Sequence, residues 1–423
     1  MSVGHLVKIE RQRQDMKQEV LAQGICSASY LSKIENGTAI PSDQILQLLF
    51  TRLKIVSVAD QTEAKLTEIL DQFKRIVDQR DRTSASLLLK EMNALSLNAS
   101  LNSIDFILME TRLLLFDEQP SPIVEKNIVI LNSVVNEMSG KQKFHFYLIK
   151  GIQAYNENHF SFSLSLFSKA ETFCVKFNAE DWETAELHYV LSLASLSDYR
   201  DFTAIEYAQK ALAYFNSKMI ISRSISCLII IGLAKKRIGN ITEAITIFKE
   251  ALEVLENSDT SFHIETIEHN LGICFSLMND EKLALQYFIS AINKKKHAND
   301  KIVTAIAILK EYYKTGNLDE AAVWLETCLS MLNQVTRNEI HYKHHLIVYE
   351  TLLFGSDDFY QAFQNVLDYL SESNNYYHCF IYCNLLSKKL AEKNEYKKAT
   401  VYYEKAFNYY LKHKKINHWG DLY

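Results

Sequence analysis

Residues 16–41 of this chain read Met16-KQEVLAQGICSASYLSKIENGTAI-Pro41. The apolar positions in this stretch are Met16, Val20, Leu21, Ile25, Leu31 and Ile34. Their spacing predicts a short amphipathic helix, a break at Gln23-Gly24 and a second short helix packed on the same core. Ser27 is placed to cap the second helix, and Asn36-Gly37 to end it in a left-handed residue. The pattern is typical of a helix-turn-helix, and the alternative is an ordinary helical hairpin.

The exposed face of the second helix is predicted to contact DNA. Ser27, Ala28, Ser29 and Lys33 occupy this face. Small and hydrogen-bonding side chains let a helix approach base edges in the major groove. Gln18 opens the first helix, where its amide and the helix N-terminus are placed to meet a phosphate. Arg11 is a phosphate candidate on the preceding helix, and the alternative for it is a solvated surface charge.

Composition predicts an all-α protein. The chain has 423 residues with 11 glycines and 3 prolines, and no proline follows Pro122. A long stretch without the strongest helix breaker favours helix nearly throughout. No run of 18 apolar residues marks a membrane helix, and the first residues lack the apolar core of a signal peptide. We therefore expect a cytoplasmic protein that has no contact with membranes.

The charge distribution and the spacing of the cysteines limit the classes of function that the chain is expected to have. Residues 1–58 carry a net charge of +2 and the remainder −7. Residues 1–58, called the head below, are only weakly basic and are expected to make few phosphate contacts, so we expect a dimer on DNA. The seven cysteines are scattered without a Cys-x-x-Cys pair, as expected of reduced core thiols rather than of a metal site. No phosphate-binding loop, nucleophile elbow or catalytic carboxylate pair appears, so we expect neither an enzyme nor a cofactor.

The body of the chain is repetitive. A pattern recurs in which a large residue follows a small one by four positions and is often followed by another small residue, as in Ala244/Phe248/Ala251. The first positions are Ser163, Ala204, Ala244, Ala284, Ala321, Ala362 and Ala399. In three repeats a glycine lies twelve residues upstream, at Gly151, Gly232 and Gly272. This period of about 40 residues predicts antiparallel helix pairs that cross where small residues let the backbones approach. The large second residue is expected to fill the adjacent layer.

The repeat resembles a lengthened tetratricopeptide repeat, which implies a superhelix with a concave, peptide-binding surface lined by the first helix of each pair. Three domains follow from these patterns. We predict a helix-turn-helix domain at 1–58, a linker helix at 59–80 and a tetratricopeptide-like peptide-binding and dimerisation domain at 81–423.

The segment Gly24-ICSASYLSKIEN-Gly37 is similar to the helix-turn-helix of a Gram-positive regulator family that includes Rap, Rgg, NprR, PlcR and PrgX proteins. The turn is one residue shorter than in generic repressors, and Cys26 stands where glycine is usual. The number of repeats is nearest to NprR. The resemblance implies a quorum-sensing transcription factor, active as a homodimer or higher oligomer on double-stranded promoter DNA and switched by a short signalling peptide. It also implies a sporulation phosphorelay protein as a further partner.

Polar side chains on the first helices of the repeats are the candidates for binding that peptide. Asn270 ranks first, because its amide both donates to and accepts from a peptide unit, and Asn384 ranks second. Weaker candidates are Arg112, His188, Tyr189, Lys235, Tyr312 and Tyr349. For the asparagines the alternative is an exposed or inter-helix amide.

Two alternatives remain open at this stage. The group His341, His344 and His345 has no third ligand at a suitable spacing, so a solvated or packing role is favoured over a metal site. For the whole chain, the alternative to a peptide-regulated transcription factor is a repeat scaffold that sequesters a phosphorelay or other protein.

Overall fold

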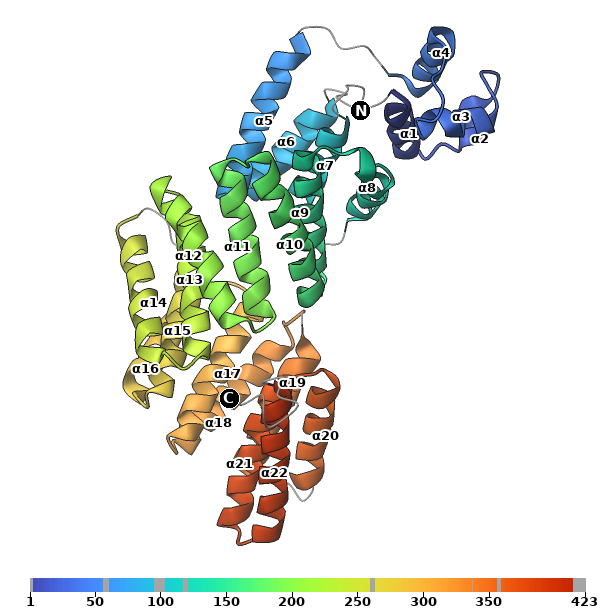
Figure 1. The fold of residues 1–423 in the computed structure, drawn as a ribbon. Helices are drawn as coiled ribbons and strands as arrows, with labels where there is room; N and C mark the ends of the chain where they lie inside the picture. The colour runs from blue at the N-terminus through green and yellow to red at the C-terminus, as the bar shows by residue number, and fades with distance from the viewer. Residues whose placement is uncertain are drawn as a thin grey trace. The chain divides into compact units, whose positions relative to one another are not determined.

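The structure, a computed structural model, describes residues 3–55, 61–94, 103–116, 121–258, 263–336, 338–355 and 359–413. Every regular element in these ranges is helical, so the predicted all-α class is confirmed (Figure 1). None of the described helices combines the length and apolar character needed to span a bilayer. The chain divides into two compact units, Met1–Phe262 and His263–Tyr423, and each is described by itself.

The first unit begins with a small helical head followed by α5 to α14. The head helices are α1 (Val3–Arg13), α2 (Gln18–Ala22), α3 (Ala28–Glu35) and α4 (Asp43–Leu53). Next come α5 (Gln61–Gln79), α6 (Arg82–Ala94), α7 (Ser103–Leu114), α8 (Pro122–Ser133) and the 3-10 turn η2 (Val135–Glu137). The paired helices of this unit are α9 (Gly140–Asn156), α10 (Phe160–Phe177), α11 (Asp181–Ser197), α12 (Asp201–Ser217), α13 (Ile221–Arg237) and α14 (Ile241–Glu256).

The second unit contains only paired helices among its described residues. They are α15 (Ile264–Leu277), α16 (Glu281–Lys294), α17 (Ala298–Lys314), α18 (Leu318–Leu332), α19 (Glu339–Phe354), α20 (Phe359–Glu372), α21 (Tyr376–Glu392) and α22 (Tyr396–His413). Each pair packs antiparallel, and successive pairs pack on one another.

The head folds as its local sequence predicts. Between α2 and α3, Gly24 adopts a left-handed φ of 72°. The Ser27 hydroxyl accepts a hydrogen bond from the backbone N–H of Tyr30 at 3.2 Å and so caps α3. Gly37, just beyond the end of α3, also has a left-handed φ of 70°. The predicted break, cap and terminus of the two motif helices are therefore confirmed.

The repeats also pack as predicted, through small residues at helix crossings. The first positions from Ser163 to Ala321 are fully buried on the second helix of each pair. A β-carbon placed at Gly151 would lie 2.3 Å from the Phe167 ring, and one at Gly272 would lie 2.5 Å from the Phe288 ring. The two helices of these pairs therefore approach more closely than any side chain on the first helix would allow.

The repeat pattern fails at its C-terminal end. Ala362 is only half-buried, and Tyr403 exposes 47% of its surface although the pattern predicts that it fills an adjacent layer. Tyr403 lies on α22, the last described helix, so no further described pair covers its ring.

The region predicted as a linker helix contains α5. Ile69, Phe73 and Val77 on its predicted apolar face are buried against α6 and α7, whereas Leu70 is exposed. The side chain of Leu66, which also belongs to that face, lies outside the described residues, as do residues 59 and 60 of the linker. The three domain boundaries stay a prediction.

The α1 helix belongs to two hydrophobic cores. Val7 is buried in the core of the head, whereas Ile9 is buried among residues of α7 and α8. Polar contacts accompany this packing: Lys8 Nζ donates to the carbonyl of Ser133 at 3.1 Å, and Lys126 Nζ donates to the carbonyl of Arg13 at 2.9 Å. The head is thus docked on the body through its first helix.

One buried carboxyl group lies within α1 and is poorly compensated. Glu10 exposes 4% of its surface, its Oε1 atom has no hydrogen-bond partner, and the nearest Arg13 guanidinium nitrogen is 3.9 Å away. Burial raises the pKa of Glu10 to about 7, although the charge of Arg13 opposes this shift. The folded head therefore holds a proton that the unfolded chain releases at a lower pH.

We predict that Gly232→Ala destabilises the repeat domain by about 1–3 kcal/mol, the usual cost of forcing extra volume into a packed core. The added methyl group would lie 2.6 Å from the Phe248 ring. Chemical denaturation followed by circular dichroism measures the loss. The second substitution Phe248→Leu in the Gly232→Ala background removes the clash. A double variant no more stable than expected from the sum of the two single changes would contradict this account.

We predict that Glu10→Gln stabilises the head by about 1–3 kcal/mol at pH 8 and leaves its stability unchanged at pH 4.5. Because burial raises the pKa of Glu10, its contribution to stability is present below pH 4.5 and is lost as the pH rises through about 7. The variant keeps the neutral form at every pH. Calorimetric unfolding of the full chain at both pH values measures the difference. The exposed Glu19 provides a matched control, Glu19→Gln, for which no such pH-dependent gain is expected.

Candidate functional site

The recognition face of α3 is exposed and has few internal contacts. Ser27, Ser29 and Lys33 are exposed, and Ala28 is half-buried at the start of the helix. The hydroxyls of Ser27 and Ser29 lie 3.2 Å apart, and the Lys33 ammonium has no hydrogen bond or ion pair with a described residue. Ser27, Ala28 and Ser29 thus lie together at the start of α3, and Lys33 lies in its last turn. Their assignment to DNA contact stays a prediction.

Arg11 and Gln18 have internal partners instead. Two guanidinium nitrogens of Arg11 donate to the Glu35 carboxylate at 2.6 and 2.9 Å, and Gln18 Nε2 donates to the same carboxylate at 2.7 Å. Glu35 is only 1% exposed. These bonds join α1, α2 and the end of α3, so both side chains hold the head together. A role in phosphate binding rests on the sequence pattern alone.

The two asparagine candidates lie on first helices of the second unit. Asn270, on α15, is buried, and its Nδ2 donates to the carbonyl of Thr266 at 2.9 Å. Asn384, on α21, is half-buried and makes no side-chain hydrogen bond with a described residue. Tyr312 on α17 is half-buried, whereas Tyr349 on α19 is buried with its ring 5.5 Å from that of Tyr313. Asn384 and Tyr312 are therefore the more accessible of the four.

The four candidates in the first unit have structural partners. His188 stacks near Tyr207, and burial lowers the pKa of its imidazole to about 4. Lys235 pairs with the Glu243 carboxylate at 2.8 Å. Arg112 and Tyr189 are buried and belong to one cluster around Glu186. None of these contacts tests a role in peptide binding, which stays a prediction for all four.

The Glu186 cluster joins α5, α7, α11 and α13. The Glu186 carboxylate accepts hydrogen bonds from Arg112 and, at 2.5 Å, from Arg223, whose guanidinium also lies 4.1 Å from the Tyr189 ring centre. Burial by itself would raise the pKa of Glu186, but the charges of Arg223 and Arg112 outweigh it and lower the pKa to about 2. The carboxylate is therefore ionised at neutral pH and ties the helices together. Sequence reasoning missed it, because its members are up to 111 residues apart in the chain.

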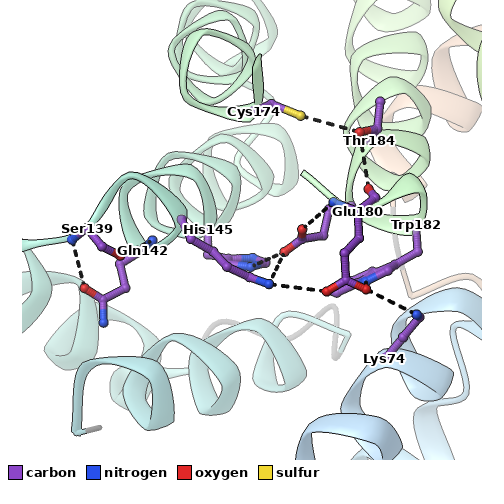
Figure 2. Close-up of polar contacts among 10 residues, drawn as sticks. Lys74, Ser139, Gln142, His145, Cys174, Glu180, Trp182 and Thr184 are labelled. Atoms are coloured by element: carbon purple, nitrogen blue, oxygen red, sulfur yellow. Dashed lines mark hydrogen bonds and ion pairs between the residues drawn. The ribbon is translucent and has the colours of Figure 1, made fainter. Parts of the chain in front are cut away.

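A cavity of about 390 Å³ lies between α5, α6, α7, α9 and α11. Its walls are mostly apolar and include Phe73, Met109 and Trp182. Figure 2 shows the polar groups at its rim, where α5, α9 and the start of α11 meet. No local sequence pattern indicates this cavity, because its walls come from helices that are distant in the chain.

Ion pairs cross this rim. The Lys74 ammonium lies 3.4 Å from the Glu180 carboxylate, which also accepts a hydrogen bond from the Trp182 indole at 3.1 Å (Figure 2). The His145 imidazole lies 2.9 Å from the Glu183 carboxylate. Burial raises the pKa of Glu183, but the hydrogen bond and charge of His145 outweigh it, so the net shift is downward. The rim is thus closed by pairs between its own side chains.

Comparison with known proteins agrees with this architecture. Residues 7–61 match the helix-turn-helix family and residues 225–297 match the tetratricopeptide repeat family. The chain is 28% identical over 402 residues to the transcriptional activator NprA of Geobacillus stearothermophilus, a match that covers 92% of this chain and 98% of the relative.

Solved structures show the same fold. The apo form of the quorum sensor NprR from B. thuringiensis matches with a TM-score of 0.72 and 17% identity, covering 82% of this chain and 99% of that one. NprR in complex with its cognate peptide NprX matches with a TM-score of 0.60 and 16% identity, covering 81% and 98%. The resemblance inferred from the sequence motifs is therefore confirmed: the chain is similar to the activator NprA along nearly its whole length, and a match to the helix-turn-helix family precedes a match to the tetratricopeptide repeat family.

Proposed function

We propose that this protein is a cytoplasmic quorum-sensing transcriptional regulator that binds promoter DNA through α3 and is switched by a short peptide bound to its repeats. The observation that carries the proposal is the recognition face of α3, where Ser27, Ser29 and Lys33 are exposed within a head that is otherwise held by internal bonds. The similarity to the activator NprA along nearly the whole chain supports it.

The head contributes few phosphate contacts, so DNA binding requires two copies. Of its basic residues, Arg11 is bonded to Glu35 and Lys8 to the body, which leaves fewer charges for the phosphate backbone. Affinity from phosphate contacts rises with their number, and a two-fold dimer doubles that number on a palindromic site. A homodimer is therefore part of the proposal.

A peptide acts by favouring one arrangement of the repeats. A ligand shifts a conformational equilibrium only by its difference in affinity for the two states. The α1 helix packs on α7 and α8, so a displacement of those helices also displaces α1 and the head. A phosphorelay protein as a further partner stays a prediction, as does the sign of regulation.

We predict that Lys33→Ala and Ser29→Ala weaken binding to the specific operator far more than to random DNA. A good contact to a base edge contributes roughly 1–3 kcal/mol of discrimination. The operator is selected from a randomised duplex library with the wild-type chain, and affinities are measured by fluorescence anisotropy at fixed salt. Lys54, which follows α4, gives the control Lys54→Ala. Equal losses on specific and random DNA would reassign these side chains to backbone contacts, and a wild-type chain that selects no sequence would refute DNA regulation.

We predict that Asn270→Ala and, to a lesser degree, Asn384→Ala weaken the binding of a short peptide while leaving DNA affinity in its absence unchanged. Each lost amide leaves peptide groups unpaired, at a cost of roughly 1–3 kcal/mol. The peptide is chosen from a positional-scanning library of synthetic octapeptides and measured by calorimetry. The exposed Asn333, just beyond α18, provides the control Asn333→Ala. Peptide affinity equal to that of the wild type in both variants would show that the peptide binds elsewhere on the chain.

A further inference from the structure

Three histidine side chains, His341 and His345 on α19 and His378 on α21, gather on the first helices of two successive pairs in the second unit. The charge of Lys310, on the first helix α17 of the preceding pair, acts on all three. The Nε2 atoms of His341 and His345 lie 3.0 Å apart. The rings of His345 and His378 are centred 4.5 Å apart, and those of His341 and His378 are 6.2 Å apart.

The repeat register produces this grouping. Positions 341 and 378 are 37 residues apart, as are positions 345 and 382, so His341 is equivalent to His378 and His345 to Tyr382. His345 is buried, and its Nδ1 is hydrogen-bonded to the Tyr382 hydroxyl. A hydrogen bond between the two Nε2 atoms of His341 and His345 requires one ring to donate and the other to accept. The pair therefore holds a single proton between its two Nε2 atoms while both rings are neutral.

His378 has one ring nitrogen that remains available. Its Nδ1 lies 2.9 Å from Asn375 Oδ1, which acts as the acceptor, so the neutral ring keeps its free lone pair on Nε2. Protonation would turn this atom into a donor. His341, His378 and Lys310 are half-buried, so each keeps part of its surface exposed.

Among the described residues, no acidic side chain is paired with this cluster. Burial and the charge of Lys310 together lower the pKa of His378 to about 3, and burial lowers that of Lys310 to about 8. The charge of Lys310 also lowers the pKa of His341 and His345. Lys310 has no hydrogen bond or ion pair with a described residue, and no carboxylate counters these shifts. Partly buried basic groups without a counter-charge are unfavourable in a folded protein. Within the described ranges, no group of three histidine, cysteine or carboxylate side chains is arranged to hold a metal ion.

We propose that Lys310, together with His341 and His378, forms an anion-binding subsite that takes a carboxylate of the bound peptide, from an acidic side chain or from its C-terminus. This inference rests on the proposed function. The cluster shares α21 with Asn384, which lies six residues beyond His378 on the same helix. A carboxylate supplies the missing negative charge and accepts hydrogen bonds from the Lys310 ammonium. It accepts one from His378 only where its own charge raises the lowered pKa of that imidazole enough to protonate it.

The subsite makes peptide affinity depend on pH. A carboxylate favours the charged forms of Lys310 and His378, so affinity falls as the pH rises through about 8, where Lys310 loses its proton. The groups that face the cluster include Lys310 from α17, His341, His344 and Tyr349 from α19, Tyr369 from α20, Tyr377, His378 and Tyr382 from α21, and His413 from α22. All of these groups are basic or phenolic, so none of them reverses the expected fall of peptide affinity with rising pH.

Matched octapeptide libraries test the proposal on the full chain. One pair of libraries differs only in a free or amidated C-terminus, and another includes or omits Asp and Glu. At pH 7 we expect the wild type to prefer a carboxylate at one position by about 10- to 100-fold, the usual effect of a hydrogen bond to a charged group. Lys310→Met loses this preference, Lys310→Arg retains it, and Lys343→Met, an exposed position on α19, leaves it unchanged.

A stability measurement separates a binding role from a structural one. Because Lys310 is half-buried and has no ion pair with a described residue, Lys310→Met should raise the thermal unfolding midpoint in the absence of peptide, whereas loss of a structural ion pair would lower it. Equal binding of acidic and neutral peptides to the wild type would overturn the proposal. So would the same carboxylate preference in wild type and Lys310→Met.

Inorganic phosphate distinguishes failure of this subsite from failure of the proposed function. If no library peptide binds the wild type, the peptide-regulated function is refuted and the carboxylate assignment falls with it. A phosphate-dependent rise of the unfolding midpoint at pH 7 that Lys310→Met abolishes would then identify a site for a free oxyanion. Absence of such a rise in the wild type would show that the cluster binds no anion.

Discussion

The close crossing of two helices within each pair is the constraint on which the repeat domain depends. At Gly232 and Gly272 the phenylalanine of the second helix lies where a side chain of the first helix would be. Because the crossing fixes the depth and rotation of both helices, it also fixes which residues of the first helix point away from its partner. The position of Asn270, two residues before Gly272 on α15, therefore depends on the contact that this glycine makes with α16.

The head depends on a different interaction. Glu35 accepts hydrogen bonds from Arg11 and Gln18, which lie on the two preceding helices. Breaking a buried pair of this kind usually costs 3–5 kcal/mol, because one charge is left without compensation. The same α1 helix carries Ile9 into the core formed with α7 and α8. The hydrogen bonds that hold the head together and the apolar contacts that attach it to α7 and α8 therefore both involve α1. A movement of α1 thus affects both sets of contacts.

Features that depend on neighbouring residues could be predicted from the sequence. The turn at Gly24, the Ser27 cap and the register of small residues in the repeats all follow from local spacing, and the structure contains them. Features that depend on distant residues could not. Arg11 was a candidate for solvent-exposed phosphate contact because nothing near it in the chain indicates that Glu35, 24 residues later, is its partner. Likewise, no spacing rule relates Arg112 to a carboxylate 74 residues away.

Two groups of basic residues differ in whether a carboxylate of the fold pairs with them. This difference distinguishes a structural cluster from a candidate binding site. Arg112 and Arg223 share the carboxylate of Glu186, whose pKa falls to about 2, so each guanidinium has an ion pair within the fold. Lys310 and the histidines around it have no such carboxylate among the described residues, and the charge of Lys310 lowers the pKa of its neighbours instead. Folding alone explains the first arrangement, because both guanidinium groups pair with a carboxylate. The second is unfavourable in the isolated chain, and its cost is offset only when an anion binds.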